Sequence, residues 1–485
     1  MQLNMLLDRN DCSPIEIKNI MYDSRDKKPN SIFFCLQGIT NDGHSFITQA
    51  IDNGAVAIVH SREIRSKKEG IAYIFESDLD NSFAKAVNRF FGSPSSKLKL
   101  IGITGTNGKT TIGSLIFQLL NFQYKTGYIG TLGVKTPDYQ LKPSLTTQDL
   151  VTNQQLLSKM VSEHVNFCAF EVSSQGIELG RVKQLVFDCC VFTNLTQDHL
   201  DFHLNMESYY QAKKQLFLQL SENGFSVINI DDVYGLRLSK EITKKNITVS
   251  MKSSDVDVFI HSIVLDKNET RFSITTESKT HNFVTNLIGK YNIFNLVQAM
   301  IVCHEYGLMF DGMIESIKHI DVIEGRIERV ENDFGFDIFV DFAHTPDGLE
   351  KIMSFAKEII QESGRVITVF GAPGKRDKSK RAQMGAVADK YCDLIILTED
   401  DPRDEQVSDI SDQIASMIYM HPYVKIESRV EAIRNAISVA KPNDILLILG
   451  KGPEKTMYRH KPEPYDGDAQ VIIDCLNKRK EEEYE

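Results

Sequence analysis

The chain has 485 residues, of which 42% are hydrophobic and 25% are charged, and it carries a formal net charge of −11 at pH 7. This length and composition predict a globular protein of about three domains. The acidic balance argues against a nucleic-acid-binding surface, which is normally basic, and no uninterrupted apolar run approaches the roughly 20 residues that span a bilayer.

The first region, residues 1–97, predicts a small mixed α/β domain. Its first residues, Met1–Asp8, have no basic segment and too short an apolar stretch for a signal peptide, so we expect a cytoplasmic protein. The apolar runs Ser31–Leu36 and Ala55–Val59 are typical of short strands. The polar stretch Ser93–Lys97 contains a proline and predicts a linker to the next domain.

The second region opens with a glycine-rich loop. The apolar run Leu98–Ile103 predicts a buried strand and Ile112–Leu120 predicts a helix; residues 102–111 read Gly-Ile-Thr-Gly-Thr-Asn-Gly-Lys-Thr-Thr. Such a loop directs backbone N–H groups and the positive end of a helix at a phosphate, Lys109 would reach the outer phosphates, and the Thr110 hydroxyl would bind Mg²⁺. The first glycine lies one residue too early for the common spacing. The agreement of strand, loop, lysine and helix nevertheless favours a nucleoside triphosphate site over a chance glycine turn.

The rest of this region, to residue 324, predicts a mostly parallel sheet covered by helices on both faces. Apolar runs at Phe167–Val172, Val186–Phe192 and Phe225–Ile230 alternate with helical segments, as parallel sheets require. The stretch Val249–Val284 instead alternates polar and apolar residues, which predicts antiparallel strands. The eight cysteines include no C-x-x-C pair, which favours free thiols in a reducing cytoplasm.

Polar side chains follow two strands of the predicted sheet. Glu171 ends one apolar run, and the segment Thr193–His203, which includes His199, follows another. Ligands bind at the carboxyl ends of strands in open parallel sheets, so Glu171 is a candidate metal ligand. A surface or core position is the alternative for His199 alone. The polar groups gathered at two strand ends favour a site.

Lys213 lies in a predicted helix, Ser208–Leu220, and all four side chains three and four positions away from it are apolar or aromatic. This setting predicts a partly desolvated amine with a lowered pKa. A neutral amine can capture CO₂ as a carbamate, which is an anionic ligand for Mg²⁺ or for water. The alternative is a lysine whose stem runs along the core, and periodicity alone favours it; Lys214 satisfies the same pattern nearly as well.

The third region, residues 325–485, predicts a second doubly wound sheet. Its apolar strand runs are Ile338–Phe342, Val366–Phe370, Leu394–Thr398 and Ile445–Leu449. Three of these runs are followed by charged turns, at Gly371–Asp377, Asp400–Arg403 and Gly450–Glu454. The turns contain both acidic and basic groups, as a ligand with an ammonium and a carboxylate requires. The two neighbouring aspartates also require a compensating cation.

Taken together, these strings resemble the Mur ligase family, in particular the branch that adds the third amino acid of the peptidoglycan stem peptide. Each match is weak alone, but the matches follow the family's order along almost the whole chain. The matching segments are Tyr22–Arg25, Asp42–His44, Gly105–Thr111, Thr146–Thr147, Glu171–Ser174, Thr193–His199, Tyr210–Lys213, Asn229–Asp232, Asn292–Asn295, Gly325–Arg326, Asp341–Asp347 and Asp400–Arg403.

The resemblance implies an α/β protein of three domains. Residues 1–97 would hold the UDP end of the substrate, residues 98–324 would form a central P-loop ATPase, and residues 325–485 would form a Rossmann-like domain for the incoming amino acid. ATP, as co-substrate, would phosphorylate the carboxylate of a UDP-N-acetylmuramoyl dipeptide, and the amino group of a diamino acid would attack the acyl phosphate. Charge neutralisation by Lys109 and two Mg²⁺ ions would assist this transfer. We expect a monomer that binds no nucleic acid and spans no membrane.

The resemblance also implies roles for individual residues. The catalytic groups would be Lys109, Glu171, His199 and Lys213. Thr110 and Glu171 would hold one Mg²⁺, and Glu171, His199 and a carbamylated Lys213 (N6-carboxylysine) would hold or support the second. The ATP contacts would be Gly105, Thr106, Asn107, Gly108, Lys109, Thr110, Thr111, Asn295, Arg326 and Asp341. The UDP-muramoyl dipeptide would contact Ser24, Thr146, Thr147, Ser173 and Arg181. The amino-acid pocket would contain Arg376, Asp400, Asp401, Arg403, Gly450 and Glu454.

Departures from the family pattern leave the acceptor amino acid open. The Asp-Asn-Pro-Arg motif typical of meso-diaminopimelate enzymes has aspartate at position 401 here. Arg403 would pair with the distal carboxylate of diaminopimelate, which L-lysine lacks. Asp401 would instead suit the distal ammonium of lysine, and the Gly371–Gly374 turn also resembles lysine-type enzymes. We favour meso-diaminopimelate because an unpaired buried guanidinium is costly.

Two other functions stay as alternatives. A folate polyglutamate-type ligase shares the phosphate loop and the acyl-phosphate chemistry, but it is not expected to carry the domain that contains Asp23–Arg25. A non-catalytic, nucleotide-binding paralogue is the second alternative. The presence of Lys109, Glu171, His199 and Lys213 argues against a decayed site.

Overall fold

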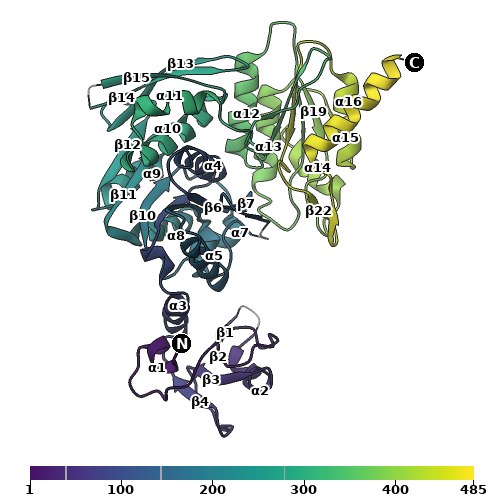
Figure 1. Ribbon diagram of the computed structural model, residues 1–485. Helices are drawn as coiled ribbons and strands as arrows, with labels where there is room; N and C mark the ends of the chain where they lie inside the picture. The colour runs from purple at the N-terminus through teal and green to yellow at the C-terminus, as the bar shows by residue number, and fades with distance from the viewer. Residues whose placement is uncertain (39–40, 143–144, 278, 485) are drawn as a thin grey trace.

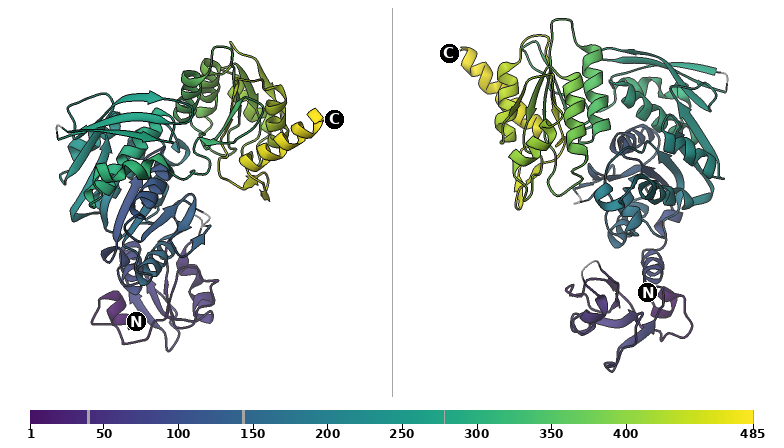
Figure 2. Two further views of the ribbon diagram at one scale, coloured as in Figure 1. Left: turned by 45° about the horizontal axis from the view of Figure 1, so that its top comes forward. Right: turned by 180° about the vertical axis from the view of Figure 1, so that it is seen from behind.

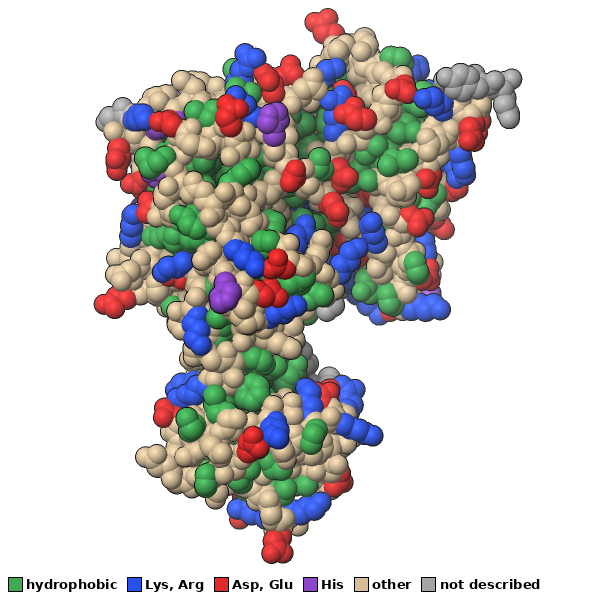
Figure 3. All heavy atoms as spheres, viewed as in Figure 1, with side chains coloured by type: hydrophobic (Ala, Val, Ile, Leu, Met, Phe, Trp, Pro, Cys, Tyr) green, Lys and Arg blue, Asp and Glu red, His purple; other side chains and the backbone are tan. Residues whose placement is uncertain are grey.

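The computed structural model describes residues 1–38, 41–142, 145–277 and 279–484. The chain forms three α/β units, built on a 4-stranded, an 11-stranded and a 6-stranded sheet. The N-terminal unit joins the central unit through α3 (Leu79–Phe90), and the two chain ends lie far apart (Figures 1 and 2). The surface narrows to a waist between the N-terminal unit and the rest (Figure 3). No helix in the described ranges is long and apolar enough to cross a membrane.

The N-terminal sheet is parallel, in the order β1-β2-β3-β4. Asp78 caps α3 by accepting a hydrogen bond from the Asn81 amide, and Phe34 of β2 packs edge-on against Phe83 of α3, with ring centroids 5.2 Å apart. The cap and the aromatic contact hold α3 on the sheet. The other elements are α1 (Leu3–Leu7), β1 (Asn19–Met21), β2 (Ser31–Phe34), α2 (Ile47–Asp52), β3 (Ala55–His60) and β4 (Ala72–Phe75).

The central sheet is mostly parallel, as predicted, in the order β15-β14-β13-β12-β11-β10-β5-β9-β6-β7-β8. Antiparallel strands occur at its two edges, and β13–β15 form the antiparallel segment predicted from the sequence. The strands are β5 (Lys99–Thr104), β6 (Thr126–Gly130), β7 (Gly133–Lys135), β8 (Gln140–Leu141), β9 (Phe167–Glu171), β10 (Phe187–Phe192), β11 (Leu220–Asn229), β12 (Asn246–Ser250), β13 (Val258–Leu265), β14 (Thr270–Thr276) and β15 (Lys279–Thr285).

Helices cover both faces of this sheet. Ile101 and Ile103 of β5 pack in a core with α4, α10 and α11, whereas Leu100 packs in a second core with α5 and α8. Successive strand residues point to opposite faces, so both faces are buried. The helices are α4 (Lys109–Leu120), α5 (Leu150–Ser162), α6 (Ser174–Glu178), α7 (Leu200–His203), α8 (Met206–Leu218), α9 (Val233–Glu241), α10 (Lys290–Glu305) and α11 (Phe310–Lys318).

The C-terminal sheet has the order β16-β17-β21-β18-β19-β20, and only its edge pair β16–β17 is antiparallel. Its strands are β16 (Glu328–Arg329), β17 (Asp337–Asp341), β18 (Val366–Phe370), β19 (Leu394–Leu397), β20 (Tyr423–Lys425) and β21 (Ile445–Leu449). Its helices are α12 (Pro346–Ile359), α13 (Lys380–Tyr391), α14 (Val407–Ala415), α15 (Arg429–Val439) and α16 (Asp468–Tyr484), and a hairpin is formed by β22 (Thr456–Tyr458) and β23 (Pro462–Pro464).

The carboxyl ends of strands from the central and C-terminal sheets meet at one junction. A cavity of about 430 Å³ is lined by the segments that follow β5, β9 and β10 and by the segment that follows β17. Ligand sites of open parallel sheets lie outside the carboxyl ends of the strands. The fold therefore brings two such sites together, one from each sheet. We call this space the junction cavity.

Candidate functional site

The phosphate loop connects β5 to α4 and lines the junction cavity. Gly108, at the N-cap of α4, has φ of 92°, and a Cβ there would lie 2.6 Å from Asn295 Oδ1, so this position requires glycine. The Lys109 ammonium donates hydrogen bonds to the carbonyl oxygens of Gly105 and Thr106, each at 2.9 Å. The loop therefore presents a helix N-terminus and an ammonium, the groups that bind phosphate.

A carboxylate and a hydroxyl group meet beside the loop. Thr110 Oγ1 donates a hydrogen bond to Glu171 Oε2 at 3.0 Å, and Glu171 is fully buried at the end of β9. The Thr131 amide and the Tyr128 hydroxyl donate to the other carboxylate oxygen. Within the described ranges no group of three or more His, Cys, Asp or Glu side chains is placed to hold a metal ion. One carboxylate and one hydroxyl nevertheless fit Mg²⁺, which binds few protein ligands together with substrate phosphates.

The C-terminal unit contributes to the same cavity. Arg326 Nη2 donates a hydrogen bond to Thr110 Oγ1 at 3.1 Å. Asp341, at the end of β17, accepts from the amides of Ile327 and Ala343 at 2.9 and 2.8 Å, and burial raises its pKa. The predicted ATP residues Asn295, Arg326 and Asp341 all line the junction cavity with Thr106–Thr111. The structure thus gathers them from two units around one loop.

Lys213 of α8 is buried beneath the phosphate loop. It is 1% exposed, its Nζ donates to Gly105 O at 2.8 Å, and it lies 4.7 Å from the centre of the Tyr209 ring. Burial, together with the nearby ammonium of Lys109, holds the pKa of Lys213 well below its usual value. Lys214, by contrast, is a quarter exposed and forms an ion pair at 2.8 Å with a glutamate of α9. The fold therefore distinguishes the buried Lys213 from the partly exposed Lys214, which the periodicity of the sequence does not.

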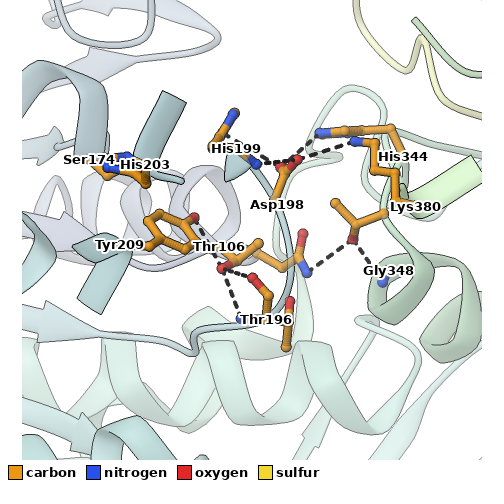
Figure 4. Close-up of polar contacts among 12 residues, drawn as sticks. Thr106, Ser174, Thr196, Asp198, His199, His203, Tyr209, His344, Gly348 and Lys380 are labelled. Atoms are coloured by element: carbon orange, nitrogen blue, oxygen red, sulfur yellow. Dashed lines mark hydrogen bonds and ion pairs between the residues drawn. The ribbon is translucent and has the colours of Figure 1, made fainter. Parts of the chain in front are cut away.

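A charged cluster joins the central and C-terminal units across the junction (Figure 4). Asp198, which follows β10, is 5% exposed and lies 3.2 Å from Lys380 Nζ, at the start of α13. His199 Nε2 and His344 Nε2 lie 3.5 and 3.7 Å from its Oδ2. Although burial opposes it, the contacts with His344, His199 and Lys380 hold the pKa of Asp198 well below its usual value. Burial lowers the pKa of His199 to about 4, so its imidazole is neutral near pH 7.

The charged turns of the C-terminal unit line a second cavity, of about 180 Å³, which we call the acceptor cavity. It contains all the residues predicted for the amino-acid pocket: Arg376, Asp400, Asp401, Arg403, Gly450 and Glu454. The fully buried Lys451 donates to Asp401 Oδ1 at 2.8 Å and also contacts Glu454. Lys451 is the compensating cation that the paired aspartates required.

Two guanidinium groups face this cavity without a carboxylate partner. In the part of the chain that the structure describes, neither Arg376 nor Arg403 forms an ion pair, and Arg403 Nη1 donates to Gly374 O at 2.9 Å. The Oδ2 atom of the buried Asp377 also has no hydrogen-bond partner among the described residues. The acceptor cavity therefore holds free charges of both signs, as a zwitterionic ligand requires.

A third cavity, of about 270 Å³, opens beside the phosphate loop. It shares Asn194, Tyr291, Asn295 and Lys351 with the junction cavity. Its apolar walls include Met251, Leu265, Phe294 and Phe355. A nucleotide whose phosphates lie on the loop can extend its base into this space, which we call the base cavity.

Four of the five residues predicted for the UDP-muramoyl dipeptide lie together at the junction cavity. Thr147 Oγ1 donates to Ser173 Oγ at 3.2 Å, and Arg181 Nη1 donates to Thr147 O at 2.9 Å. The hydroxyl oxygen of Thr146 lies 3.1 Å from that of Thr131, whose amide donates to Glu171. Ser24 lies apart from them in the N-terminal unit, where it donates to Gln49 Oε1 at 2.7 Å.

Sequence reasoning missed three groups at the site. Lys451 lies inside the charged turn Gly450–Glu454, so its charge could have identified it as the cation that compensates the paired aspartates. Lys380 and Gln298 carried no comparable signal. The partner of Lys380, Asp198, lies 182 positions away in the chain, and Gln298 belongs to a helix that reads as buried core.

Three family models match this chain. They are the Mur ligase family catalytic domain over residues 16–88, the Mur ligase middle domain over residues 103–303, and the Mur ligase glutamate ligase domain over residues 325–452. Among curated relatives, the chain is 38% identical over 443 residues to UDP-N-acetylmuramoyl-L-alanyl-D-glutamate–2,6-diaminopimelate ligase 1 of Clostridium acetobutylicum, covering 91% of this chain and 90% of that one. It is 40% identical over 466 residues to the ligase of that name from Caldanaerobacter subterraneus, covering 95% of each.

Solved structures show the same architecture. A structure of UDP-N-acetylmuramoyl-L-alanyl-D-glutamate–2,6-diaminopimelate ligase is similar over 99% of both chains, with a TM-score of 0.72 and 26% identity. MurF ligase from Thermotoga maritima in complex with ADP has a TM-score of 0.65 at 16% identity, covering 96% of this chain and 98% of that one. Folylpolyglutamate synthase from Mycobacterium tuberculosis, complexed with ADP and AMPPCP, has a TM-score of 0.62 at 15% identity and covers 76% of this chain and 91% of that one. The last two likenesses concern the fold alone.

Proposed function

Because this chain belongs to the Mur ligase family, we propose that it catalyses the ATP-dependent addition of meso-diaminopimelate to UDP-N-acetylmuramoyl-L-alanyl-D-glutamate in cytoplasmic peptidoglycan synthesis. The observation that carries this proposal is that the junction and acceptor cavities share six lining residues and therefore adjoin. An acyl phosphate formed in the first would then lie next to an amine bound in the second. The residues that line both cavities are Asp198, His199, Phe342, His344, Arg376 and Glu454.

In the first step, the γ-phosphoryl group of ATP passes to a carboxylate oxygen of the dipeptide. The amides of the phosphate loop and the Lys109 ammonium bind the phosphates, and Arg326 reaches the loop from the C-terminal unit. Mg²⁺, when held by Thr110 and Glu171, supplies positive charge that offsets the phosphate oxygens. These residues act by position and charge and form no covalent intermediate of their own.

A second Mg²⁺ position is proposed from Glu171, His199 and Lys213. The neutral imidazole of His199 has a free electron pair for a cation. The lowered pKa of Lys213 favours the neutral amine, which forms a C–N bond with CO₂ and releases one proton to give the carbamate. A carbamate at this position would be an anion close to the Lys109 ammonium, which supports its formation.

In the second step, the amino nitrogen of the acceptor attacks the acyl carbon and phosphate leaves from the tetrahedral intermediate. Water must be kept from the acyl phosphate while this happens. The ion pair between Asp198 and Lys380 holds the central and C-terminal units together beside the reaction site. Closure of these two units around the substrates would exclude water from the acyl phosphate.

The charges of the acceptor cavity favour diaminopimelate over L-lysine. Diaminopimelate has two carboxylates and two ammonium groups, whereas lysine has only one carboxylate. Within the described residues, Arg376 and Arg403 both lack a carboxylate partner, so each has room for one carboxylate of the ligand. Lys451 already compensates Asp401, so the aspartate at this position does not require a ligand ammonium.

The dipeptide end of the substrate is assigned to the four clustered residues Thr146, Thr147, Ser173 and Arg181, and its UDP end to the N-terminal unit with Ser24. A cavity of about 1040 Å³ between the N-terminal and central units supports this division. At its edge the Tyr22 hydroxyl donates to Asp149 Oδ1 at 3.1 Å, which links the two units.

One assay tests the proposal directly. Purified protein with ATP, Mg²⁺ and UDP-N-acetylmuramoyl-L-alanyl-D-glutamate should release phosphate when meso-diaminopimelate is added, and mass spectrometry should find the tripeptide product. L-lysine should support a much lower kcat/KM. Phosphate release with a reduced folate and glutamate, and none with the muramoyl dipeptide, would instead identify a folate polyglutamate-type ligase.

A further inference from the structure

The second step of the proposed reaction requires a proton acceptor. An amino acid carries its amine as an ammonium near pH 7, and an ammonium has no electron pair with which to attack an acyl carbon. The group that removes this proton must reach both the acceptor cavity, which would hold the amine, and the junction cavity, which would hold the acyl phosphate. The candidates are the residues that line both cavities: Asp198, His199, Phe342, His344, Arg376 and Glu454.

Three of these candidates are excluded by their chemistry or by the role already proposed for them. The Phe342 side chain has no polar atom, and the Arg376 guanidinium has five N–H donors and no acceptor. The imidazole of His199 has a free electron pair, but that pair is proposed to bind the second Mg²⁺. It is therefore not available for a proton.

The two carboxylates that line both cavities are engaged by ammonium groups. Asp198 Oδ1 lies 3.2 Å from Lys380 Nζ, and Glu454 accepts a hydrogen bond from Lys451. A nearby ammonium stabilises the charged form of a carboxylate, so such a group is a poor proton acceptor. Among the described residues that line both cavities, His344 is therefore the group best suited to take the proton.

The hydrogen bonding of His344 leaves one ring nitrogen with a free electron pair. His344 follows β17, and its Nδ1 lies 2.8 Å from the carbonyl oxygen of Phe342. A carbonyl oxygen accepts and never donates, so Nδ1 carries the proton of the neutral ring and the electron pair is on Nε2. The side chain is 27% exposed, so a ligand in these cavities can reach the ring.

The surroundings of Nε2 favour a ring that becomes cationic. His344 Nε2 lies 3.7 Å from Asp198 Oδ2, which belongs to a nearly buried carboxylate. Asp198 extends from the central unit, whereas His344 and Lys380 belong to the C-terminal unit (Figure 4). Lys380 contacts the other oxygen of this carboxylate, so Oδ2 is left to interact with the imidazole. An imidazolium formed here would be stabilised by the negative charge of Asp198.

We propose that His344 Nε2 accepts a proton from the ammonium of the acceptor amino acid and so frees the amine to attack the acyl phosphate. This inference rests on the proposed ligase function. The freed electron pair forms the C–N bond of the tetrahedral intermediate. The C–O bond to phosphate then breaks, its electron pair leaves on the phosphate oxygen, and the second proton of the nitrogen passes to that phosphate. His344 finally releases its proton to water.

The experiment separates proton removal from formation of the acyl phosphate. Hydroxylamine is uncharged at pH 7, so it attacks an acyl phosphate without first losing a proton and gives a hydroxamate. The full-length protein is supplied with ATP, Mg²⁺ and UDP-N-acetylmuramoyl-L-alanyl-D-glutamate, and then with either meso-diaminopimelate or hydroxylamine. Mass spectrometry measures the rate of tripeptide formation in the first case and of hydroxamate formation in the second.

The variant His344→Asn removes Nε2 and keeps an N–H group that can donate to the Phe342 carbonyl. We expect kcat for tripeptide formation to fall by about a hundredfold or more, the scale of general base catalysis, while hydroxamate formation stays within about threefold. An equal loss in both reactions would overturn the inference, because His344 would then act before the amine attacks. A higher KM for diaminopimelate with unchanged kcat would also overturn it, because His344 would then only bind the amino acid.

The matched control is His421→Asn. His421 also directs its Nδ1 at a backbone carbonyl, that of Asp389 at 2.6 Å, but it lines neither cavity. This variant should keep both rates of the natural protein. If the natural protein forms neither tripeptide nor hydroxamate, the ligase function fails and the inference falls with it. If His344→Asn forms both products at the natural rates, the ligase function stands and the role of His344 falls.

Discussion

The ammonium of Lys451 donates a hydrogen bond to the carboxylate of Asp401 at 2.8 Å, and the Lys451 side chain is completely buried. The same carboxylate oxygen accepts the amide of Tyr458 at 2.9 Å. Asp401 is therefore compensated by the protein itself. Among the described residues, Arg376 and Arg403 form no ion pair, so their guanidinium groups are free for the carboxylates of the proposed acceptor amino acid.

Replacing Lys451 should destabilise the C-terminal unit. In Lys451→Met the charge of Asp401 is left buried without a cation, which we expect to lower the free energy of unfolding by about 3 kcal/mol. The double variant Lys451→Met/Asp401→Asn removes both charges and should recover part of this loss. Urea denaturation of the natural protein and of the two variants measures their free energies of unfolding. A double variant that is less stable than Lys451→Met would contradict the pairing.

Replacing Arg403 should affect the acceptor amino acid and spare the nucleotide. In Arg403→Ala we expect KM for meso-diaminopimelate to rise by about a hundredfold, because a charge-assisted bidentate contact is lost, while KM for ATP stays within about twofold. Steady-state kinetics with each substrate varied in turn measures both constants. An equal rise in both would refute the placement of Arg403 in the acceptor cavity.

Lys213 should make the activity depend on CO₂. Degassed buffer should lower the turnover of the natural protein, and added bicarbonate should restore it. Lys213→Ala should lower turnover by about a hundredfold or more, the scale of lost metal-assisted charge neutralisation, and should not respond to bicarbonate. Lys214→Ala is the matched control, because Lys214 is partly exposed and paired with Glu241. Full activity of Lys213→Ala without CO₂ would exclude the carbamate.

Glu405 should contribute a pH-dependent part of the stability. Its hydrogen bond with the buried Arg381 lowers its pKa to about 2. The folded protein therefore binds this proton less readily than the unfolded chain, so the stabilisation is complete above pH 4.5 and is lost as the pH falls toward 2. Glu405→Gln should be less stable than the natural protein by about 1 kcal/mol at pH 6 and equally stable near pH 2.

The measurement is a denaturation series across this pH range on both proteins. Glu431→Gln is the control, because Glu431 is half exposed and pairs with its helix neighbour Arg434 at the surface. We expect that control to differ little from the natural protein at any pH. If the loss of stability of Glu405→Gln relative to the natural protein persists unchanged below pH 3, the effect of the substitution is not electrostatic.

Local pattern was enough to predict the parallel sheets, the antiparallel segment and the phosphate loop. The phosphate loop could be predicted because its strand, glycines, lysine and helix are consecutive in the chain. Glu171 could be predicted as a candidate metal ligand because it ends an apolar run. The assignment of Ser24 to the dipeptide site depended on resemblance alone. The structure places Ser24 in another unit from Thr146 and Thr147, and the substrate contacts of all three residues stay predictions.

By itself, the order of residues determined the class of fold, the position of the phosphate loop and the charged turns at the strand ends, because each depends on neighbours within a few positions. Only the tertiary structure decided which charges meet. Lys213 was distinguished from Lys214 by the side of α8 that packs beneath the loop, and Asp401 received its counter-ion from a turn 50 positions away. Such pairs depend on how separate elements pack, and a pattern read along one segment contains no information about the segment that will lie against it.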